Sequence, residues 1–455
     1  MAGRPDVLVV VLDSMRKDRV STYGHRRATT PTLTELADGA TTFESAYTPA
    51  PWTLPSHCSM FTGTFPSEHG VTNGFADASV RLPDCVEPLG EHLADAGYRT
   101  AGFSNNPWVG QLSGLDRGFD EFVEWDLEIS RSADEGLHGP RERGLSRLHA
   151  VLGNAARQPV FLLKRRFFTG RLVDRATDWI ARTADGAAPT FTFLNLMEAH
   201  SPYFPPSSAF AALDLPTPGP VEPRVLNTKL LGYVMGNLEL DGDRRRRVME
   251  YYDASLRYQD GQLARLLDAL REHGAYDDTL VVVCADHGKT LGEYAREETP
   301  PHYTRNLNVD VPLVVKRPGQ RTGAHEAAPV ELTGLHDLVL SGGETTLAAA
   351  SGDGGVALVE DHVPHAGAET PDDVTRWRAV TDGDRRLVRG EDGEEYLFVV
   401  GDGTDERAGD PGTARDLRDR LDERVAALGT PTEGDGEAAD LDRTVEGQLR
   451  DLGYM

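Results

Sequence analysis

DVLVVVL (residues 6–12) is a short run of mostly β-branched apolar residues. Such a run is typical of a strand that is buried on both faces, as in the parallel sheet of an α/β protein. Similar runs stand at 191–196 (FTFLNL), 279–285 (TLVVVCA) and 310–316 (DVPLVVK), with helical periodicity between them, as at 245–272. We therefore predict an α/β fold with a large, doubly wound, mostly parallel sheet.

The composition becomes richer in Gly, Asp and Glu after residue 318. We expect a main α/β domain over residues 1–320, with insertions at about 126–170 and 201–245, and a smaller C-terminal α+β subdomain over 321–455. The strands expected in the subdomain are 377–381, 384–389 and 395–400. They predict a small antiparallel sheet, followed by a helix at about 413–428 and an acidic, Gly-rich linker.

The chain is strongly acidic, with 73 Asp and Glu against 47 Lys and Arg and a formal net charge of −26. This charge argues against nucleic acid as a partner. Acid enrichment with only five lysines resembles halophilic-type proteins, in which dense salt screens the self-repulsion. An acidic surface also repels anionic substrates, so a site for one needs local positive charge, such as a metal ion.

The three cysteines, Cys58, Cys85 and Cys284, fit neither a disulfide framework nor a zinc motif. We find no signal-peptide pattern and no membrane-spanning apolar run, so we expect a cytoplasmic protein. The basic, aromatic segment RQPVFLLKRRFF at 157–168 stands out. It could make peripheral contact with an anionic membrane or a substrate tail. A solvated helix that packs its aromatic rings inward is the favoured alternative.

The stretch WTLP at residues 52–55 is typical of a helix start, with Thr53 as the N-cap and Pro55 in the first turn. The amides and the dipole of a first turn favour negative charge. Thr53 is therefore a candidate nucleophile, provided that a neighbouring group activates its hydroxyl. The simpler alternative is that Thr53 only caps the helix.

Charged side chains follow two of the predicted core strands. Asp13 comes directly after the first strand, and Asp286 and His287 follow the strand at 279–285. The carboxyl ends of parallel strands meet at one edge, where ligands bind in open α/β sheets. With Thr53, these residues form a suitable shell for one divalent cation: Mn²⁺, Mg²⁺ or Ca²⁺, with Zn²⁺ as a further option. Such an ion would stabilise the ionised Thr53 hydroxyl and neutralise substrate oxygens.

These motifs together resemble the sulfatase branch of the alkaline phosphatase superfamily over about residues 5–320. The matching motifs are, in order, Asp13, TLPSH (53–57), TG (62–63), HSPY (200–203), DHG (286–288) and VPL (311–313). The resemblance implies a metal-dependent enzyme acting on an anionic ester.

Several positions depart from the family pattern. Thr53 stands where sulfatases carry the Cys or Ser that is oxidised to formylglycine, and His57 replaces the Arg of that motif. Ser14 stands where many sulfatases have a second Asp ligand, and Asn105 and Asn106 replace an expected Lys-x-His pair. A Thr nucleophile with this ligand set is similar to the phosphoglycerol transferases and phosphodiesterases of the superfamily.

The resemblance also assigns roles to individual residues. It implies Asp13, Thr53, Asp286 and His287 as metal ligands, Thr53, His200 and His302 as catalytic residues, and His57, Asn105 and Asn106 as substrate contacts. A second metal, on Glu198, His200 and His302, is the less favoured arrangement.

The leading hypothesis is a metal-dependent hydrolase or transferase that cleaves phosphate esters, of phosphodiester or phosphoglycerol type, through a covalent Thr53 intermediate. The first alternative is a sulfuric ester hydrolase that acts without formylglycine. An alternative of another class is a catalytically silent binding protein on the same fold. The sequence does not predict the oligomeric state.

Overall fold

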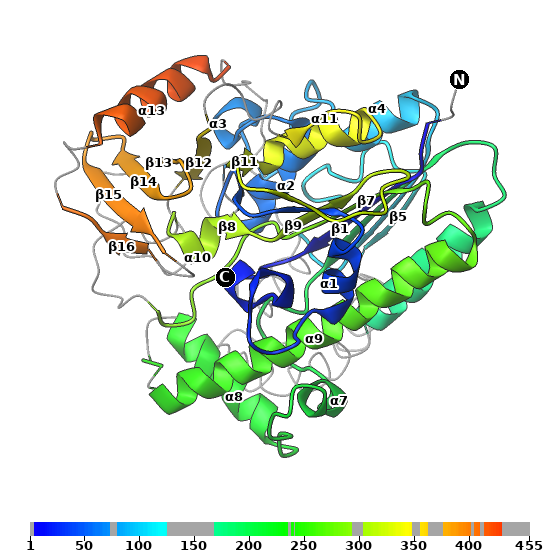
Figure 1. The fold of residues 1–455 in the computed structure, drawn as a ribbon, viewed down its shortest axis with the longest axis horizontal. Helices are drawn as coiled ribbons and strands as arrows, with labels where there is room; N and C mark the ends of the chain where they lie inside the picture. Colours follow the sequence, from blue (N-terminus) through cyan, green and yellow to red (C-terminus); the bar gives the residue numbers. More distant parts are fainter. Residues whose placement is uncertain are drawn as a thin grey trace, which may run out of the picture.

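The computed structural model describes residues 4–72, 80–124, 168–234, 238–240, 242–293, 304–347, 355–362, 376–401, 405–409 and 414–429. Its centre is an eight-stranded sheet in the order β10-β2-β9-β7-β1-β6-β4-β5 (Figure 1). The strands are β1 (Val7–Leu12), β2 (Thr41–Phe43), β4 (Arg99–Ser104), β5 (Glu121–Glu124), β6 (Thr190–Leu196), β7 (Leu280–Cys284), β9 (Leu313–Lys316) and β10 (Ala324–Glu326).

The sheet is mostly parallel, as predicted. β1 pairs in parallel with β6 and β7, and β4 pairs in parallel with β6 and β5. β9 alone among these strands runs antiparallel to its neighbours, β7 and β2. Every residue of β1 is buried, which explains its continuous apolar sequence.

Helices cover both faces of this sheet, as a doubly wound fold requires (Figure 1). On one side lie α1 (Pro31–Ala37), α7 (Ser207–Ala211), α8 (Glu222–Val234) and the long α9 (Gly242–Glu272); on the other lie α2 (Thr53–Thr62), α3 (Pro66–His69), α4 (Leu89–Asp95) and α11 (Leu335–Leu340). α9 buries the leucines that predicted it, among them Leu256, Leu263 and Leu270. Residues 168–183 are also helical.

Short elements join the main sheet to the C-terminal part. A three-stranded sheet has the order β11-β3-β8. The joining elements are β3 (Ala46–Tyr47), α10 (Asn306–Val309), β8 (Asp310–Val311), β11 (Val330–Glu331) and the 3-10 helix η3 (Leu332–Gly334). Two further 3-10 helices, η1 (Lys17–Arg19) and η2 (Ser21–Tyr23), lie between β1 and α1 in the sequence.

The small antiparallel C-terminal sheet is also present, with five strands where three were expected. It contains β12 (Ala357–His362), β13 (Arg376–Thr381), β14 (Arg385–Gly390), β15 (Glu395–Val400) and β16 (Asp405–Arg407). One face packs on α13 (Arg415–Ala427) through Leu417 and Leu421, and the other buries Trp377 and Phe398 with Tyr47 of β3. The sheet therefore lies between α13 and the main body of the protein.

The structure describes most of one of the two predicted insertions and almost none of the other. The insertion at 126–170 and the basic segment 157–168 fall almost entirely outside the described residues, whereas α7 and α8 lie within the one at 201–245. Among the described helices, none combines the length and the apolar character needed to cross a membrane.

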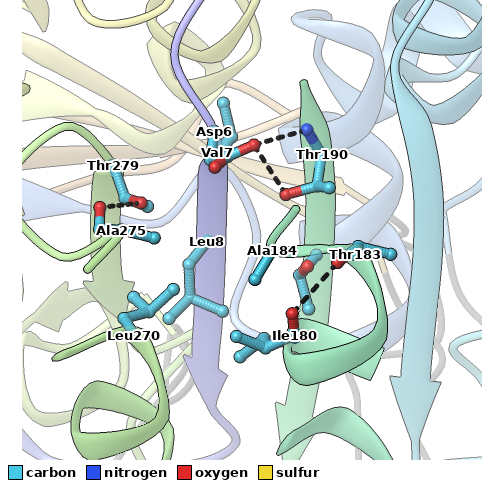
Figure 2. A pocket seen from close by; sticks show the side chains of 11 residues that line it. Asp6, Val7, Leu8, Ile180, Thr183, Ala184, Thr190, Leu270, Ala275 and Thr279 are labelled. Atoms are coloured by element: carbon cyan, nitrogen blue, oxygen red, sulfur yellow. Dashed lines mark hydrogen bonds between the residues drawn. The ribbon is translucent and has the colours of Figure 1, made fainter. Parts of the chain in front are cut away.

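A small cavity of about 20 Å³ lies at the amino ends of β1 and β6, between Leu8, Ile180 and Leu270 (Figure 2). Beside it, Asp6 Oδ1 accepts hydrogen bonds from the backbone N–H and the hydroxyl of Thr190, at 2.7 and 2.9 Å. This volume has room for about one water molecule. The cavity lies at the end of β1 opposite to the one that Asp13 follows.

Candidate active site at the carboxyl edge of the sheet

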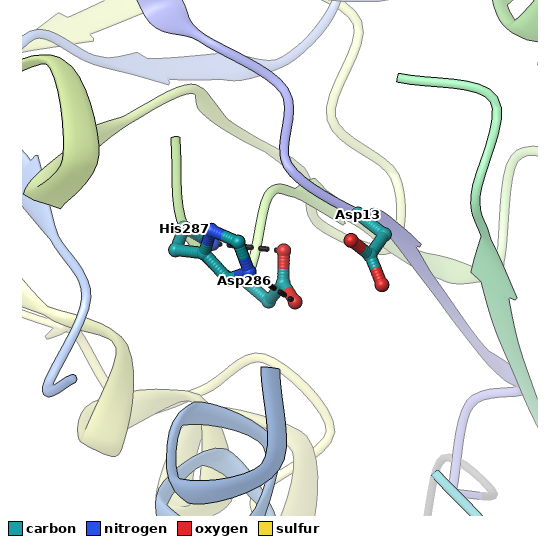
Figure 3. Close-up of side chains that lie close together, drawn as sticks. All are labelled: Asp13, Asp286 and His287. Carbon is teal, nitrogen blue, oxygen red and sulfur yellow. Dashed lines mark hydrogen bonds and ion pairs between the residues drawn. The ribbon is translucent and has the colours of Figure 1, made fainter. Parts of the chain in front are cut away.

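Asp13, Asp286 and His287 meet at the edge where β1 and β7 end (Figure 3). The register pairs Val11 with Cys284, so that the residues after each strand emerge side by side. The three side chains are buried, and one potential ligand atom from each lies within 4.8 Å of the others. The strand-end pattern in the sequence therefore located this cluster correctly.

Hydrogen-bond donors hold the carboxylates of Asp13 and Asp286 in place, and one oxygen of Asp286 accepts no hydrogen bond from the described residues. Asp286 Oδ1 accepts hydrogen bonds from the backbone N–H groups of Ser14 and His287, at 2.9 and 2.8 Å. Ser14 has a left-handed backbone (φ 61°), which turns its N–H toward Asp286. Asp286 Oδ2 is buried and accepts no hydrogen bond from any residue that the structure describes.

Asp13 is completely buried, and its oxygens accept hydrogen bonds from the Ser14 hydroxyl (2.9 Å) and from Asn106 Nδ2 (2.8 Å). Burial raises the pKa of Asp13, and the negative charge of Asp286 raises it further. Two close, buried carboxylates and an imidazole fit a bound divalent cation, because the ion would neutralise charge that burial otherwise makes costly.

The Thr53 hydroxyl lies next to this cluster, with Oγ1 3.1 Å from His287 Nε2. His287 Nδ1 lies 2.6 Å from the carbonyl oxygen of Gly288, to which it donates, so Nε2 presents its lone pair to Thr53. The predicted N-cap was wrong by one residue: Trp52 is the N-cap, and Thr53 is the first residue of α2. The Thr53 hydroxyl consequently faces His287 rather than capping the helix.

His57 lies one turn further along α2 and is completely buried. Its Nδ1 donates to the carbonyl oxygen of Thr53 at 2.8 Å and lies 3.7 Å from Asp286 Oδ2. The ring meets Phe193 edge-on, with centroids 6.2 Å apart. His57 thus contacts both the backbone of the candidate nucleophile Thr53 and the candidate metal ligand Asp286, and its expected contact with substrate stays a prediction.

Asn105 and Asn106 follow β4 and are both buried. Asn106 accepts a hydrogen bond from the Trp108 N–H at 3.0 Å while it donates to Asp13, so it orients a candidate metal ligand. Asn105 Nδ2 donates to the Thr169 hydroxyl at 3.3 Å, and that hydroxyl donates to Glu198. The sequence placed these asparagines at the correct edge, and their role toward substrate stays a prediction.

His200 follows β6, and its Nδ1 donates to the Ser201 carbonyl oxygen at 2.6 Å. His302, the other predicted catalytic histidine, lies outside the described residues. The sequence reasoning overlooked Lys289, whose Nζ lies 5.7 Å from the centroid of the Tyr203 ring. The sequence could have drawn attention to Lys289, because it directly follows the Asp-His-Gly motif in a chain with only five lysines.

The Sulfatase family profile matches residues 5–339 of the chain. The chain belongs to the sulfatase family. It is 24% identical to the choline-sulfatase of Rhizobium meliloti (strain 1021) over 348 residues, which cover 71% of this chain and 64% of that enzyme. It is 24% identical to the arylsulfatase of Clostridium perfringens (strain 13 / Type A) over 321 residues, 64% of each protein. The match thus spans somewhat less than two thirds of these two curated relatives.

Solved structures of the same fold include two phosphonate monoester hydrolases. The enzyme of Agrobacterium radiobacter aligns with a TM-score of 0.67 and 17% identity, covering 93% of this chain and 95% of that one. The enzyme of Silicibacter pomeroyi aligns with a TM-score of 0.67 and 20% identity, covering 94% and 96%. At these identities the likeness establishes the fold shared with this sulfatase-family chain.

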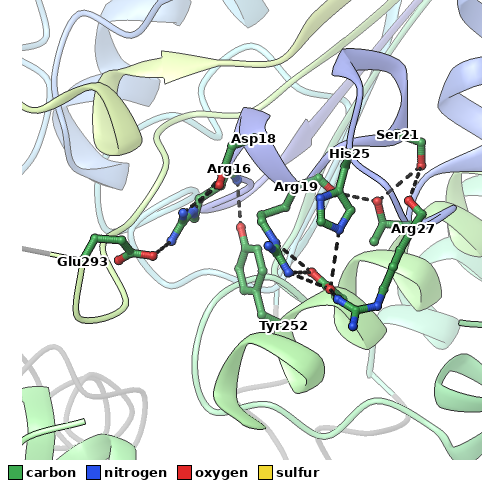
Figure 4. A network of polar contacts seen from close by, with 10 residues as sticks. Arg16, Asp18, Arg19, Ser21, His25, Arg27, Tyr252 and Glu293 are labelled. Carbon is green, nitrogen blue, oxygen red and sulfur yellow. Dashed lines mark hydrogen bonds and ion pairs between the residues drawn. The ribbon is translucent and has the colours of Figure 1, made fainter. Parts of the chain in front are cut away.

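A polar network supports the turn after β1 in this sulfatase-family site (Figure 4). The hydroxyl of Tyr252, on α9, accepts from the Arg16 N–H at 2.7 Å and donates to the Ser14 carbonyl oxygen at 2.8 Å. The Arg16 guanidinium, almost fully buried, forms ion pairs with Asp18 and Glu293. These contacts fix the backbone that carries Asp13 and directs the Ser14 N–H to Asp286.

Proposed function

We propose that this protein is a metal-dependent hydrolase or transferase that cleaves phosphate esters, of phosphodiester or phosphoglycerol type, with Thr53 as the nucleophile. The observation that supports this most directly is the 3.1 Å contact between Thr53 Oγ1 and His287 Nε2, beside two buried carboxylates. A hydroxyl at the start of a helix, next to an imidazole and two carboxylates that could hold a cation, is a suitably placed nucleophile.

Asp13, Asp286, His287 and Thr53 would hold one divalent cation, whose charge favours the ionised Thr53 hydroxyl and offsets the charge of the ester. The chain's own groups keep this set in place. Asn106 fixes one oxygen of Asp13, and the Gly288 carbonyl oxygen fixes the tautomer of His287.

In the proposed reaction, Thr53 is ionised before attack, its proton having passed to solvent, and its Oγ1 forms a bond to phosphorus as the bond to the leaving oxygen breaks. His200 in its charged form donates the Nε2 proton to the leaving oxygen, because its Nδ1–H is already engaged with Ser201. Neutral His200 then accepts a proton from water, or from an acceptor alcohol, as that oxygen attacks the phosphoryl-Thr53. Cleavage of the bond between Thr53 Oγ1 and phosphorus then releases Thr53 in its ionised form and leaves His200 charged, as at the start.

Sulfate ester hydrolysis is the second candidate, because the curated relatives include a choline-sulfatase and arylsulfatases. The same cluster would bind a sulfate ester. The difference lies in the nucleophile: Thr53 cannot be converted to the formylglycine of ordinary sulfatases, which supports phosphate over sulfate. A silent binding protein is the third reading, and it predicts no turnover of either ester.

The test compares 4-nitrophenyl phosphate, bis(4-nitrophenyl) phosphate and 4-nitrophenyl sulfate, with Mn²⁺, Mg²⁺ or Ca²⁺ at high salt. We expect metal-dependent cleavage of a phosphate ester, and a phosphoryl group on the Thr53 peptide after an acid quench, detected by mass spectrometry. Added glycerol separates transfer from hydrolysis through the phosphorylated alcohol. Cleavage of the sulfate ester alone would replace the leading proposal with the second candidate.

The matched variants are Thr53→Ala and Thr62→Ala, at the two ends of α2. Thr62 donates to the Cys58 carbonyl oxygen and lies away from the cluster. Thr53→Ala should remove turnover and the labelled peptide, whereas Thr62→Ala should keep both. Normal turnover by Thr53→Ala would refute the covalent mechanism.

A further inference from the structure

The one-turn helix α10 packs directly against the loop that carries Asp286 and His287. The Gly288 N–H donates to the Asn308 carbonyl oxygen at 2.8 Å. A Cβ on Gly288 would lie 2.0 Å from the carbonyl oxygen of Leu307, so the backbones of loop and helix are in close contact. The position of this loop therefore depends on the position of α10.

Such a short helix has little stability of its own, because a single turn does not repay the entropy of ordering its residues. Asp405, on β16 of the C-terminal sheet, supplies outside contacts to its start. Asp405 Oδ1 accepts from Arg305 Nε at 2.7 Å, and Oδ2 accepts from the Asn306 backbone N–H at 3.2 Å. A carboxylate of the C-terminal sheet thus accepts a hydrogen bond from the first backbone N–H of α10.

Arg386 of β14 completes this arrangement. It donates to Asp405 Oδ2 at 3.1 Å and to the Asn306 side-chain oxygen at 2.9 Å. Asp405, Arg386, Arg305 and Asn306 are all buried, so each ionic contact is shielded from solvent. Asp405 is therefore an ion-pair partner of both Arg305 and Arg386.

We infer that Asp405 is a positioning residue for the metal-ligand loop, acting through Arg305 and α10 on Gly288 and so on Asp286 and His287. The inference rests on the proposed metal-dependent function. It gives the C-terminal sheet a defined part in the active site, although no residue of that sheet belongs to the metal cluster.

Replacing Asp405 with Asn removes the counter-charge and puts an amide where a carboxylate accepted from two cationic side chains and a backbone N–H. The start of α10 then loses its anchor, and the ligand loop loses its support. We expect the Kd for Mn²⁺ to rise about tenfold, as for other outer supports of metal ligands. Measured by calorimetry on the full chain, this change does not depend on turnover.

Glu360→Gln is the matched control. Glu360 is a fully buried carboxylate of the same sheet, and it accepts from Arg378 Nε at 2.7 Å and from the Ser67 N–H at 2.8 Å. The Glu360→Gln variant should have a lower free energy of unfolding in urea, while its Mn²⁺ affinity stays within about twofold of the wild type. Equal weakening of Mn²⁺ binding in both variants would show a general effect of the sheet and overturn the inference.

Arg386→Lys is a milder second variant that keeps the buried charge but replaces the two nitrogens that bond Asp405 and Asn306 with a single nitrogen on a side chain of different shape. It should weaken Mn²⁺ binding in the same direction, and it serves if Asp405→Asn fails to fold. If Asp405→Asn folds and its Mn²⁺ affinity is unchanged, the inference is refuted while the proposed function stands. If Asp405→Asn does not fold, unchanged Mn²⁺ affinity in Arg386→Lys has the same meaning. Failure of the wild-type protein to bind any of Mn²⁺, Mg²⁺, Ca²⁺ and Zn²⁺ refutes the proposed function and the inference together.

Discussion

Asp286→Asn should make the metal-free protein more stable while it removes function. The amide oxygen can keep the hydrogen bonds that Oδ1 accepts from the Ser14 and His287 N–H groups. The amide NH₂ then occupies the place of Oδ2, which accepts no hydrogen bond from the described residues. The substitution therefore removes one negative charge with little change in shape.

The magnitude follows from the distance between the charges. Carboxylate oxygens of Asp13 and Asp286 lie within 4.8 Å of each other, and both side chains are fully buried. With an effective dielectric constant of about 20, two such charges repel by ~3.5 kcal/mol. Proton uptake by Asp13, whose pKa is raised by burial and by Asp286, relieves part of this repulsion. We therefore expect a net gain of about 1–2 kcal/mol in the unfolding free energy.

Urea unfolding with EDTA and with Mn²⁺ measures both effects. The wild-type protein should gain about 2.7 kcal/mol when Mn²⁺ reaches a hundred times its Kd. Asp286→Asn should gain almost nothing, because loss of a proposed direct ligand should weaken binding by more than about a hundredfold. Its turnover should fall with its metal affinity.

Asp253→Asn supplies the control of opposite sign. Asp253 is also fully buried but accepts from Arg19 and Arg27, at 2.7 and 2.9 Å. Its neutralisation should cost about 3 kcal/mol and leave the stabilisation by Mn²⁺ intact. If Asp286→Asn destabilised the metal-free protein as much as Asp253→Asn does, the two carboxylates would not repel at this site, and the argument for a bound cation would fail.

Three further predictions concern single side chains. Thr53→Ser should keep measurable turnover where Thr53→Ala has none, since the hydroxyl remains; equal kcat in the two variants would refute this. Lys289→Ala should raise KM for a phosphate monoester about tenfold with a smaller change in kcat, and Lys289→Arg should restore KM; an unchanged KM would remove Lys289 from substrate binding. Burial lowers the pKa of His69 to about 3, and its ring nitrogens already bond the Val71 N–H and the Ser59 hydroxyl. As the pH drops, the His69 ring binds a proton in the unfolded state before it does so in the folded state. The unfolding free energy should therefore fall between about pH 6.5 and 3, by up to ~1.4 kcal/mol per pH unit. The same profile should be flatter in His69→Gln.

The sequence was sufficient for the part of the fold that depends on local pattern. Apolar runs identified β1, β6 and β7, and the strand-end rule placed Asp13 and Asp286 at one edge. That inference worked because these strands are parallel neighbours, so that residues following each strand emerge together.

Other features depend on contacts that no local pattern encodes. The left-handed backbone of Ser14 is not signalled by a glycine, yet it directs an N–H to Asp286. The antiparallel direction of β9 follows from its pairing with β7 and not from its composition. Asp405 reaches Arg305 across a hundred residues of chain, and neither residue belongs to a motif. Register, backbone strain and distant ion pairs thus had to come from the structure.

The two carboxylates also bear on the choice between an enzyme and a silent binding protein. A buried pair of like charges destabilises the fold, and Asp286 could be replaced by an amide that keeps the hydrogen bonds its Oδ1 accepts. Donors from Ser14, Asn106 and His287 hold both groups in place and leave Asp286 Oδ2 open. A site without a cation has no physical use for this arrangement, whereas a cation turns the repulsion into binding free energy. Stabilisation by Asp286→Asn in EDTA, reversed in sign by Mn²⁺, would therefore show that the two carboxylates serve a cation, and metal-dependent turnover of an ester would then separate an enzyme from a silent binding protein.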